Sequence, residues 1–77
     1  MNKIHKLVFK IHRKLFGYPM RSEIRLAFND PSFGMLSLES TVALVYICGE
    51  SIEDVSEWLN IEEVEIKSIL NKIGGRL

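Results

Sequence analysis

The sequence predicts an all-α fold, a small bundle of four or five helices in a single domain spanning residues 1–77. Three observations favour this class. A chain of 77 residues supplies one hydrophobic core, because chains this short bury only about 60% of their unfolded surface. Apolar residues recur every three or four positions along several segments, which is the period of an α-helix. The one strand-like stretch, residues 42–48, has no partner strand elsewhere in the chain.

Composition excludes several classes of protein. The chain is 47% hydrophobic and 26% charged, as ordinary globular proteins are. Its longest apolar run covers seven residues, whereas a membrane-spanning helix needs about 20. Cys48, His5 and His12 are too few and too widely spaced for a zinc site, and no paired nucleophile accompanies the histidines. We therefore expect a soluble, cytoplasmic protein that is not an enzyme and needs no cofactor, with Cys48 buried as a small apolar residue.

The first predicted helix covers residues 2–16 and carries two stripes along its length. The apolar stripe consists of Ile4, Leu7, Val8, Ile11 and Leu15. The basic stripe consists of Lys3, Lys6, Lys10, Arg13 and Lys14. We expect the apolar stripe to pack on the rest of the bundle and the basic stripe to face solvent or a partner. The same expectation disfavours attachment to a membrane surface, because an apolar stripe packed on the bundle is not available to lipid.

A turn and a second helix complete the basic N-terminal portion, residues 1–28. Gly17 ends the first helix, and Tyr18 is held extended because a proline follows it. The second helix is predicted over residues 20–28. It should place Met20, Ile24, Ala27 and Phe28 inward and Arg21 and Arg25 outward. Residues 29–34 combine turn-forming residue types and predict a loop.

The C-terminal half predicts three further helices. Residues 37–48 favour a helix because a helix stop and a new helix start come directly after them: Gly49 suits a left-handed C-cap, and Ser51 stands three residues before Asp54 as an N-cap residue does. A helix over 52–59 should bury Val55, Leu59 and Trp58.

The last predicted helix covers residues 62–73. Asn60 is expected to break the preceding helix in a left-handed conformation. The inward stripe of the last helix consists of Ile66, Ile69, Leu70 and Ile73, and Gly74-Gly75 should close the helix.

Helix, glycine, short helix, tight turn and helix come one after another over residues 36–73. Ten positions agree in type or identity with a known pattern: Gly49, Ser51, Glu53, Val55, Glu57, Leu59, Ile61, Ile66, Lys67 and Leu70. In this portion the chain resembles the helix-turn-helix of LuxR-type regulators and of the promoter-reading C-terminal domain of bacterial sigma factors. The resemblance implies a C-terminal helix-turn-helix whose second helix faces DNA, and Lys67 and Ser68 match the DNA-facing positions. Glu65 stands where the family commonly has Thr.

Charge is segregated along the chain, although the formal net charge is zero. Residues 1–28 carry seven basic residues and one acidic residue, whereas residues 29–66 carry nine acidic residues and no basic one. Glu62, Glu63 and Glu65 begin the second helix of the motif, where they oppose phosphate. Two functions stay open. The chain is a transcription regulator that binds DNA, or it is an adaptor or inhibitor that uses the same scaffold to bind a protein such as the transcription machinery.

The candidate residues for binding DNA or a transcription-related protein form two groups, and no small-molecule substrate is expected. One group is the basic stripe of the first helix. The other lies on the last helix and consists of Val64, Glu65, Lys67, Ser68, Asn71 and Lys72, with Arg76 beyond it.

Overall fold

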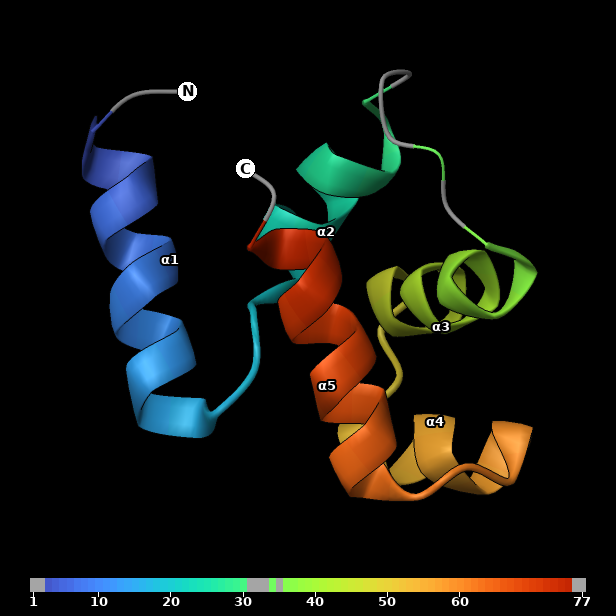
Figure 1. Ribbon diagram of the computed structural model, residues 1–77. Helices are drawn as coiled ribbons and strands as arrows, with labels where there is room; N and C mark the ends of the chain where they lie inside the picture. The colour runs from blue at the N-terminus through green and yellow to red at the C-terminus, as the bar shows by residue number, and fades with distance from the viewer. Residues whose placement is uncertain (1–2, 31–33, 35, 76–77) are drawn as a thin grey trace.

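The computed structural model describes residues 3–30, 34 and 36–75, which form five α-helices and no strand (Figure 1). The helices are α1 (Lys3–Phe16), α2 (Arg21–Phe28), α3 (Ser37–Ile47), α4 (Ile52–Leu59) and α5 (Glu63–Gly74). The prediction of an all-α bundle is confirmed, and the ambiguous stretch is helical as far as Ile47. Residue 2 of the first predicted helix and residues 31–33 of the predicted loop lie outside the described part.

The core lies between α2, α3, α4 and α5, and each of these helices packs against at least two of the others. In Figure 1, α5 stands in the middle, with α2 above it, α3 beside it and α4 below it. Ten buried residues form the core cluster: Ile24, Ala27, Val42, Ala43, Tyr46, Ile52, Val55, Ile66, Leu70 and Ile73. The predicted inward stripe of α5 is confirmed, with Ile69 at the edge of the cluster.

The boundaries of α4 lie at the predicted capping residues. Ser51 Oγ accepts a hydrogen bond from the backbone N–H of Asp54 at 3.1 Å. Gly49 has a φ of 108° and Asn60 a φ of 54°, so both residues take the left-handed conformation that the turns on either side of α4 require. The tight turn at Asn60 brings α5 back against α4.

The carboxyl end of α3 is capped by two arginines of α2. Arg21 donates from Nε to the carbonyl oxygen of Tyr46 at 3.1 Å, and from Nη2 to Gly49 at 3.2 Å and Glu50 at 2.9 Å. Arg25 Nη2 donates to the carbonyl oxygen of Ile47 at 3.2 Å. The last carbonyls of a helix lack partners within the helix and carry partial negative charge, which the guanidinium groups satisfy. Both arginines therefore bind α2 to α3 outside the core.

Gly74 is buried against the turn that precedes α2. A Cβ atom at this position would lie 2.8 Å from Pro19 Cγ and 3.1 Å from Glu23 Oε1. The predicted Gly-Gly pair does end α5, but Gly75 has a φ of −62° and forms no left-handed cap. The helix needs glycine at position 74 because Pro19 lies so close.

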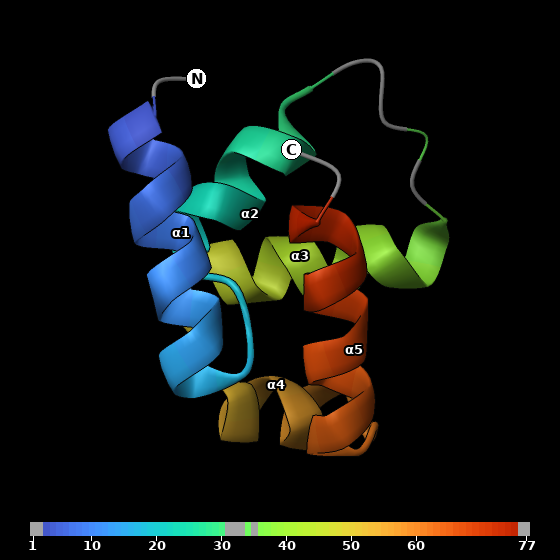
Figure 2. The same ribbon diagram turned by 60° about the vertical axis from the view of Figure 1, so that its left-hand side comes forward.

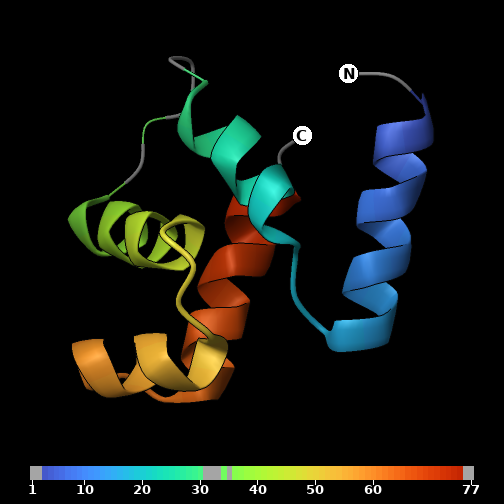
Figure 3. The ribbon, with the colours of Figure 1, turned by 180° about the vertical axis from the view of Figure 1, so that it is seen from behind.

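α1 lies outside the four-helix core, as Figures 2 and 3 show from two sides. The prediction that its apolar stripe packs on the bundle is wrong: Ile4 is 71% exposed, Leu7 57% and Ile11 48%, and Val8 and Leu15 are exposed as well. Phe9 is the one buried residue of α1. The stripe faces outward because α2 to α5 already close the core among themselves, and the side of α1 that meets them carries Phe9, His12 and Arg13.

Candidate functional site

Half of the predicted site residues on α5 are exposed to solvent. Val64 is 75% exposed, and Glu65 and Ser68 are exposed on the same helix. These three side chains lie on the surface that the core leaves open. A partner can reach them without any change in the fold.

The other half of the predicted site on α5 contacts the rest of the chain. The Lys67 ammonium lies over the ring of Tyr18, 6.0 Å from its centroid. Asn71 Nδ2 donates to the carbonyl oxygen of Gly17 at 2.9 Å. Lys72 Nζ donates to Glu39 Oε1 at 3.3 Å, and Glu39 is itself buried. The turn between α1 and α2 thus covers one side of α5, and α3 holds the lysine on the other side. Arg76 lies outside the described residues.

The amino end of α5 is strongly acidic. Glu62 is the N-cap residue, Glu63 and Glu65 stand in the first turn, and all three are exposed. Carboxylates in this position stabilise the helix because its free N–H groups carry partial positive charge. The same carboxylates cancel the attraction that a bare helix amino end has for phosphate.

The basic stripe of α1 divides into four free lysines and one engaged arginine. Lys3, Lys6, Lys10 and Lys14 are exposed, as predicted. Arg13 differs: its side chain is 33% exposed and its Nε lies 3.5 Å from Glu23 Oε1, whose side chain is 2% exposed. Arg13 points to α2 because Glu23 is buried there and needs a counter-charge.

Glu23 is the one buried charged residue of α2, and it lies between α1 and the carboxyl end of α5, a position that the sequence did not reveal. Burial raises the pKa of its carboxyl group above the ordinary value of 4.5, against the lowering effects of Arg13 and His12. Its Oε2 atom accepts no hydrogen bond from the described residues. The ion pair with Arg13 ties α1 to α2. His12 Nδ1 donates a hydrogen bond to the carbonyl oxygen of Tyr18, in the turn between the two helices, at 2.9 Å.

A shallow apolar hollow on α3 and α4 is a further candidate that the sequence analysis missed. This tryptophan hollow has a volume of about 250 Å³ and is lined by Leu44, Val45, Cys48, Glu50 and Trp58. Trp58 is 76% exposed and Leu44 is 50% exposed. Both the prediction of a buried Trp58 and the prediction of a buried Cys48 are therefore wrong.

Helical register explains the two corrections. Cys48 comes one turn after Leu44, on the exposed side of α3, whereas the core takes Val42 and Tyr46 on the other side. Trp58 comes one turn after Asp54 at the edge of α4, next to the exposed Glu57. These neighbours were the signal in the sequence: a tryptophan beside two acidic residues marks the outer edge of an amphipathic helix.

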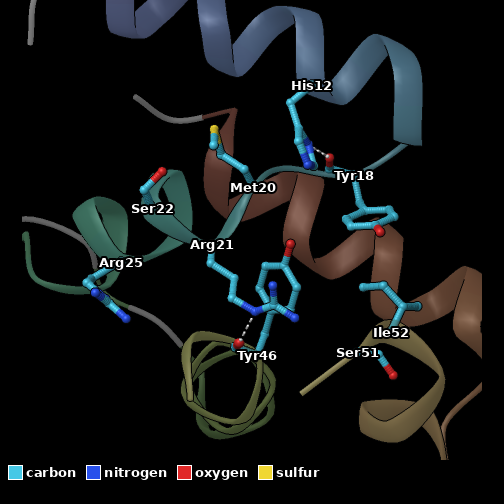
Figure 4. A pocket seen from close by; sticks show the side chains of 9 residues that line it. All are labelled: His12, Tyr18, Met20, Arg21, Ser22, Arg25, Tyr46, Ser51 and Ile52. Atoms are coloured by element: carbon cyan, nitrogen blue, oxygen red, sulfur yellow. Dashed lines mark hydrogen bonds between the residues drawn. The ribbon is translucent and has the colours of Figure 1, made fainter. Parts of the chain in front are cut away.

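A polar pocket of about 490 Å³ lies where α1, α2, α3 and α4 approach one another. Figure 4 shows Arg21 beside the Tyr46 ring and His12 pointing to the Tyr18 carbonyl. The Tyr46 hydroxyl donates to the carbonyl oxygen of Pro19 at 2.6 Å, and burial raises the pKa of Tyr46 to about 12. Since Arg21 and Arg25 already cap α3, the charged groups of this pocket serve to join helices.

Comparisons of the chain with protein-family models, with curated proteins and with solved structures gave no significant match. Among the residues that the structure describes, no group of three His, Cys, Asp or Glu side chains is placed to hold a metal ion. No helix in the described ranges combines the length and the apolar character needed to cross a bilayer.

Proposed function

We propose that the chain is a small helix-turn-helix protein of transcription regulation that acts by binding a protein partner with a basic surface. The resemblance of residues 36–73 to LuxR-type and sigma-factor domains supports the scaffold and the regulatory role. The succession of α4, the left-handed turn at Asn60 and α5 supports it as well. The kind of partner is inferred from the charges on these two helices.

The observation that carries the proposal is the state of the polar side chains on α5. Lys67, Asn71 and Lys72 are the residues that would approach a DNA groove, and each contacts another part of the chain. The side chains that remain exposed at the amino end of α5 are three glutamates and Val64. Binding to a duplex draws much of its affinity from neutralised phosphates, and the carboxylates at the amino end of α5 oppose it, although the Lys72 side chain stays 60% exposed beside Glu39. A basic protein surface complements the same face.

The tryptophan hollow supplies an anchor point for such a partner. Tryptophan is enriched among the residues that contribute most to protein–protein binding, and Trp58 stands exposed over an apolar floor of Leu44 and Val45. Glu50 lines the hollow as well and adds a carboxylate to it. An apolar side chain flanked by Lys or Arg on the partner fits this surface.

DNA binding by the chain itself is the second candidate, and the four exposed lysines of α1 favour it. In that case α1 would contact phosphates while α5 reads the groove. The two candidates differ in the substitutions to which binding responds.

The test titrates random-sequence duplex DNA and purified bacterial RNA polymerase against the chain, at about 50 and about 200 mM salt. We expect binding to the polymerase that Trp58→Ala abolishes and that Leu36→Ala, at a residue 71% exposed elsewhere on the surface, leaves intact. Two results together would instead establish DNA as the ligand. Duplex binding would depend steeply on salt, and it would be weakened by Lys67→Ala but not by Trp58→Ala.

A further inference from the structure

α1 presents to solvent a continuous apolar surface that no described part of the chain covers. Ile4, Leu7, Ile11 and Leu15 recur at helical spacing and are 71%, 57%, 48% and 73% exposed. A single exposed apolar residue is ordinary in a soluble protein, but a row of four along one helix marks an interaction surface.

The charges beside this surface all have one sign. Lys3, Lys6, Lys10 and Lys14 are exposed and lie along one flank of the apolar stripe. α1 contains no acidic residue. A helix with a long apolar face, a lysine-rich polar face and low overall hydrophobicity is the kind that lies in the interface of an anionic bilayer.

The attachment of α1 to the core leaves the stripe accessible. Phe9 and Arg13 meet the core on the side of α1 roughly opposite Ile4 and Ile11. A flat surface can therefore bury the stripe while the other four helices stay on the far side of α1. The ion pair between Arg13 and Glu23 stays intact in this arrangement.

We infer that α1 binds the surface of an anionic phospholipid bilayer, with the apolar stripe in the acyl region and the lysines at the lipid phosphates. Charge disfavours a second copy of the chain packed antiparallel on the stripe, because the lysine flanks of the two α1 helices would then meet, and a dimer of any other arrangement is an outcome of the test. An acidic groove on another protein carries the same negative charge as the bilayer, so binding to such a groove is a competing outcome that the test distinguishes. This inference is independent of the partner proposed for α4 and α5.

The experiment is flotation of the full chain with two kinds of vesicle, one of phosphatidylcholine alone and one of phosphatidylcholine with phosphatidylglycerol. We expect the chain to float with the anionic vesicles and not with the neutral ones. The double variant Leu7→Gln with Ile11→Gln should bind more than about tenfold more weakly, since two side chains no longer leave water. Lys6→Gln and Lys10→Gln should each weaken binding about fivefold. Leu38→Gln is the matched control, because Leu38 is 45% exposed on α3 and lies outside α1.

Three results would overturn the inference. The first is no flotation with anionic vesicles at low salt. The second is flotation of the double variant to the same extent as the parent chain, which would show that charge alone holds the chain on the vesicles. The third is a dimer in sedimentation equilibrium, or a complex with an acidic amphipathic peptide, that needs Leu7 and Ile11 while vesicles are not bound. Leu7 and Ile11 lie outside the core, so circular dichroism of the double variant should match that of the parent chain.

Discussion

Gly74 shows how closely one residue can fit the turn between two helices. A Cβ atom there would lie 2.8 Å from Pro19 Cγ, which belongs to a rigid ring that cannot rotate away. We expect Gly74→Ala to lower the free energy of unfolding, because overpacking costs about 1–3 kcal/mol and outweighs the gain of up to about 1 kcal/mol for alanine in a helix. Gly34→Ala is the control, since a Cβ at Gly34 meets no atom within 4 Å. Urea unfolding of the two variants measures the difference, and equal stabilities would contradict the close approach.

Truncation of Leu70 and of Leu59 tests where the centre of the core lies. Leu70 is 0% exposed, whereas Leu59 packs half-buried at the edge of the cluster. Leu70→Ala should cost about 2–5 kcal/mol, and Leu59→Ala clearly less, because a cavity at the edge is filled by solvent or by its neighbours. Chemical unfolding of both variants against the parent chain measures the two losses. A larger loss at Leu59 would mean that the core centre lies nearer to α4.

Between elements, the capping residues were predictable and the docking of α1 was not. Ser51, Gly49 and Asn60 act through bonds and dihedral angles within a few residues, so the sequence contains the whole cause of the α4 boundaries. Periodicity also identified the two stripes of α1, but it cannot say which side of the helix meets the bundle. That choice depends on whether the other helices close the core without α1 and on the buried carboxylate of Glu23. The outward Trp58 and the engaged Lys67 on the candidate surfaces likewise depend on tertiary contacts.

The docking of α1 leads to a prediction for removal of residues 1–16. The ten residues of the core cluster all lie in α2 to α5, so the shortened chain should still fold cooperatively. Its midpoint of unfolding should fall, because the buried carboxylate of Glu23 loses Arg13 and the contact of Phe9 is lost. Glu23→Gln in the shortened chain should restore part of the loss. A shortened chain that is unfolded by circular dichroism would show that α1 belongs to the core.

The contact between α1 and α2 also makes stability depend on pH. Because the pKa of Glu23 is raised by burial, the native chain holds a proton that the unfolded chain has lost between the ordinary value of 4.5 and the higher native value. The contribution of Glu23 to the free energy of unfolding therefore falls as the pH rises through this window.

Glu23→Gln isolates that contribution. We expect the stability of the parent chain relative to Glu23→Gln to decrease as the pH rises from about 4 to about 7, as measured by urea unfolding at each pH. A difference that grows with pH would show that attraction by Arg13 outweighs burial.

On the scale of the whole molecule, the surface carries opposite charge in two places. Four lysines are exposed on α1, while the exposed residues at the amino ends of α4 and α5 include Glu53, Asp54, Glu62 and Glu63. A neutral chain with this distribution can attract a basic partner and an acidic surface at the same time. The formal net charge of zero thus conceals two separate sources of electrostatic attraction.

This distribution predicts the kinetics of protein binding. Glu62→Gln with Glu63→Gln should slow association with a basic partner roughly threefold or more at low ionic strength, with little effect at high ionic strength, because rim charges mainly guide the encounter. Lys3→Gln with Lys6→Gln is the control on α1 and should not slow association. Stopped-flow measurements at two ionic strengths check both variants. An effect confined to the dissociation rate would place the glutamates inside the contact instead of at its rim.

The tryptophan hollow has a practical consequence for separating the two surfaces. Cys48 is the one cysteine of the chain and Trp58 its one tryptophan, and both line this hollow. The unmodified chain therefore carries a thiol for selective dye labelling and an intrinsic fluorophore side by side, at one of its candidate contact surfaces. A partner that seats in the hollow shifts the emission of Trp58 and shields the thiol from a maleimide. A bilayer bound through α1 leaves both signals as they are.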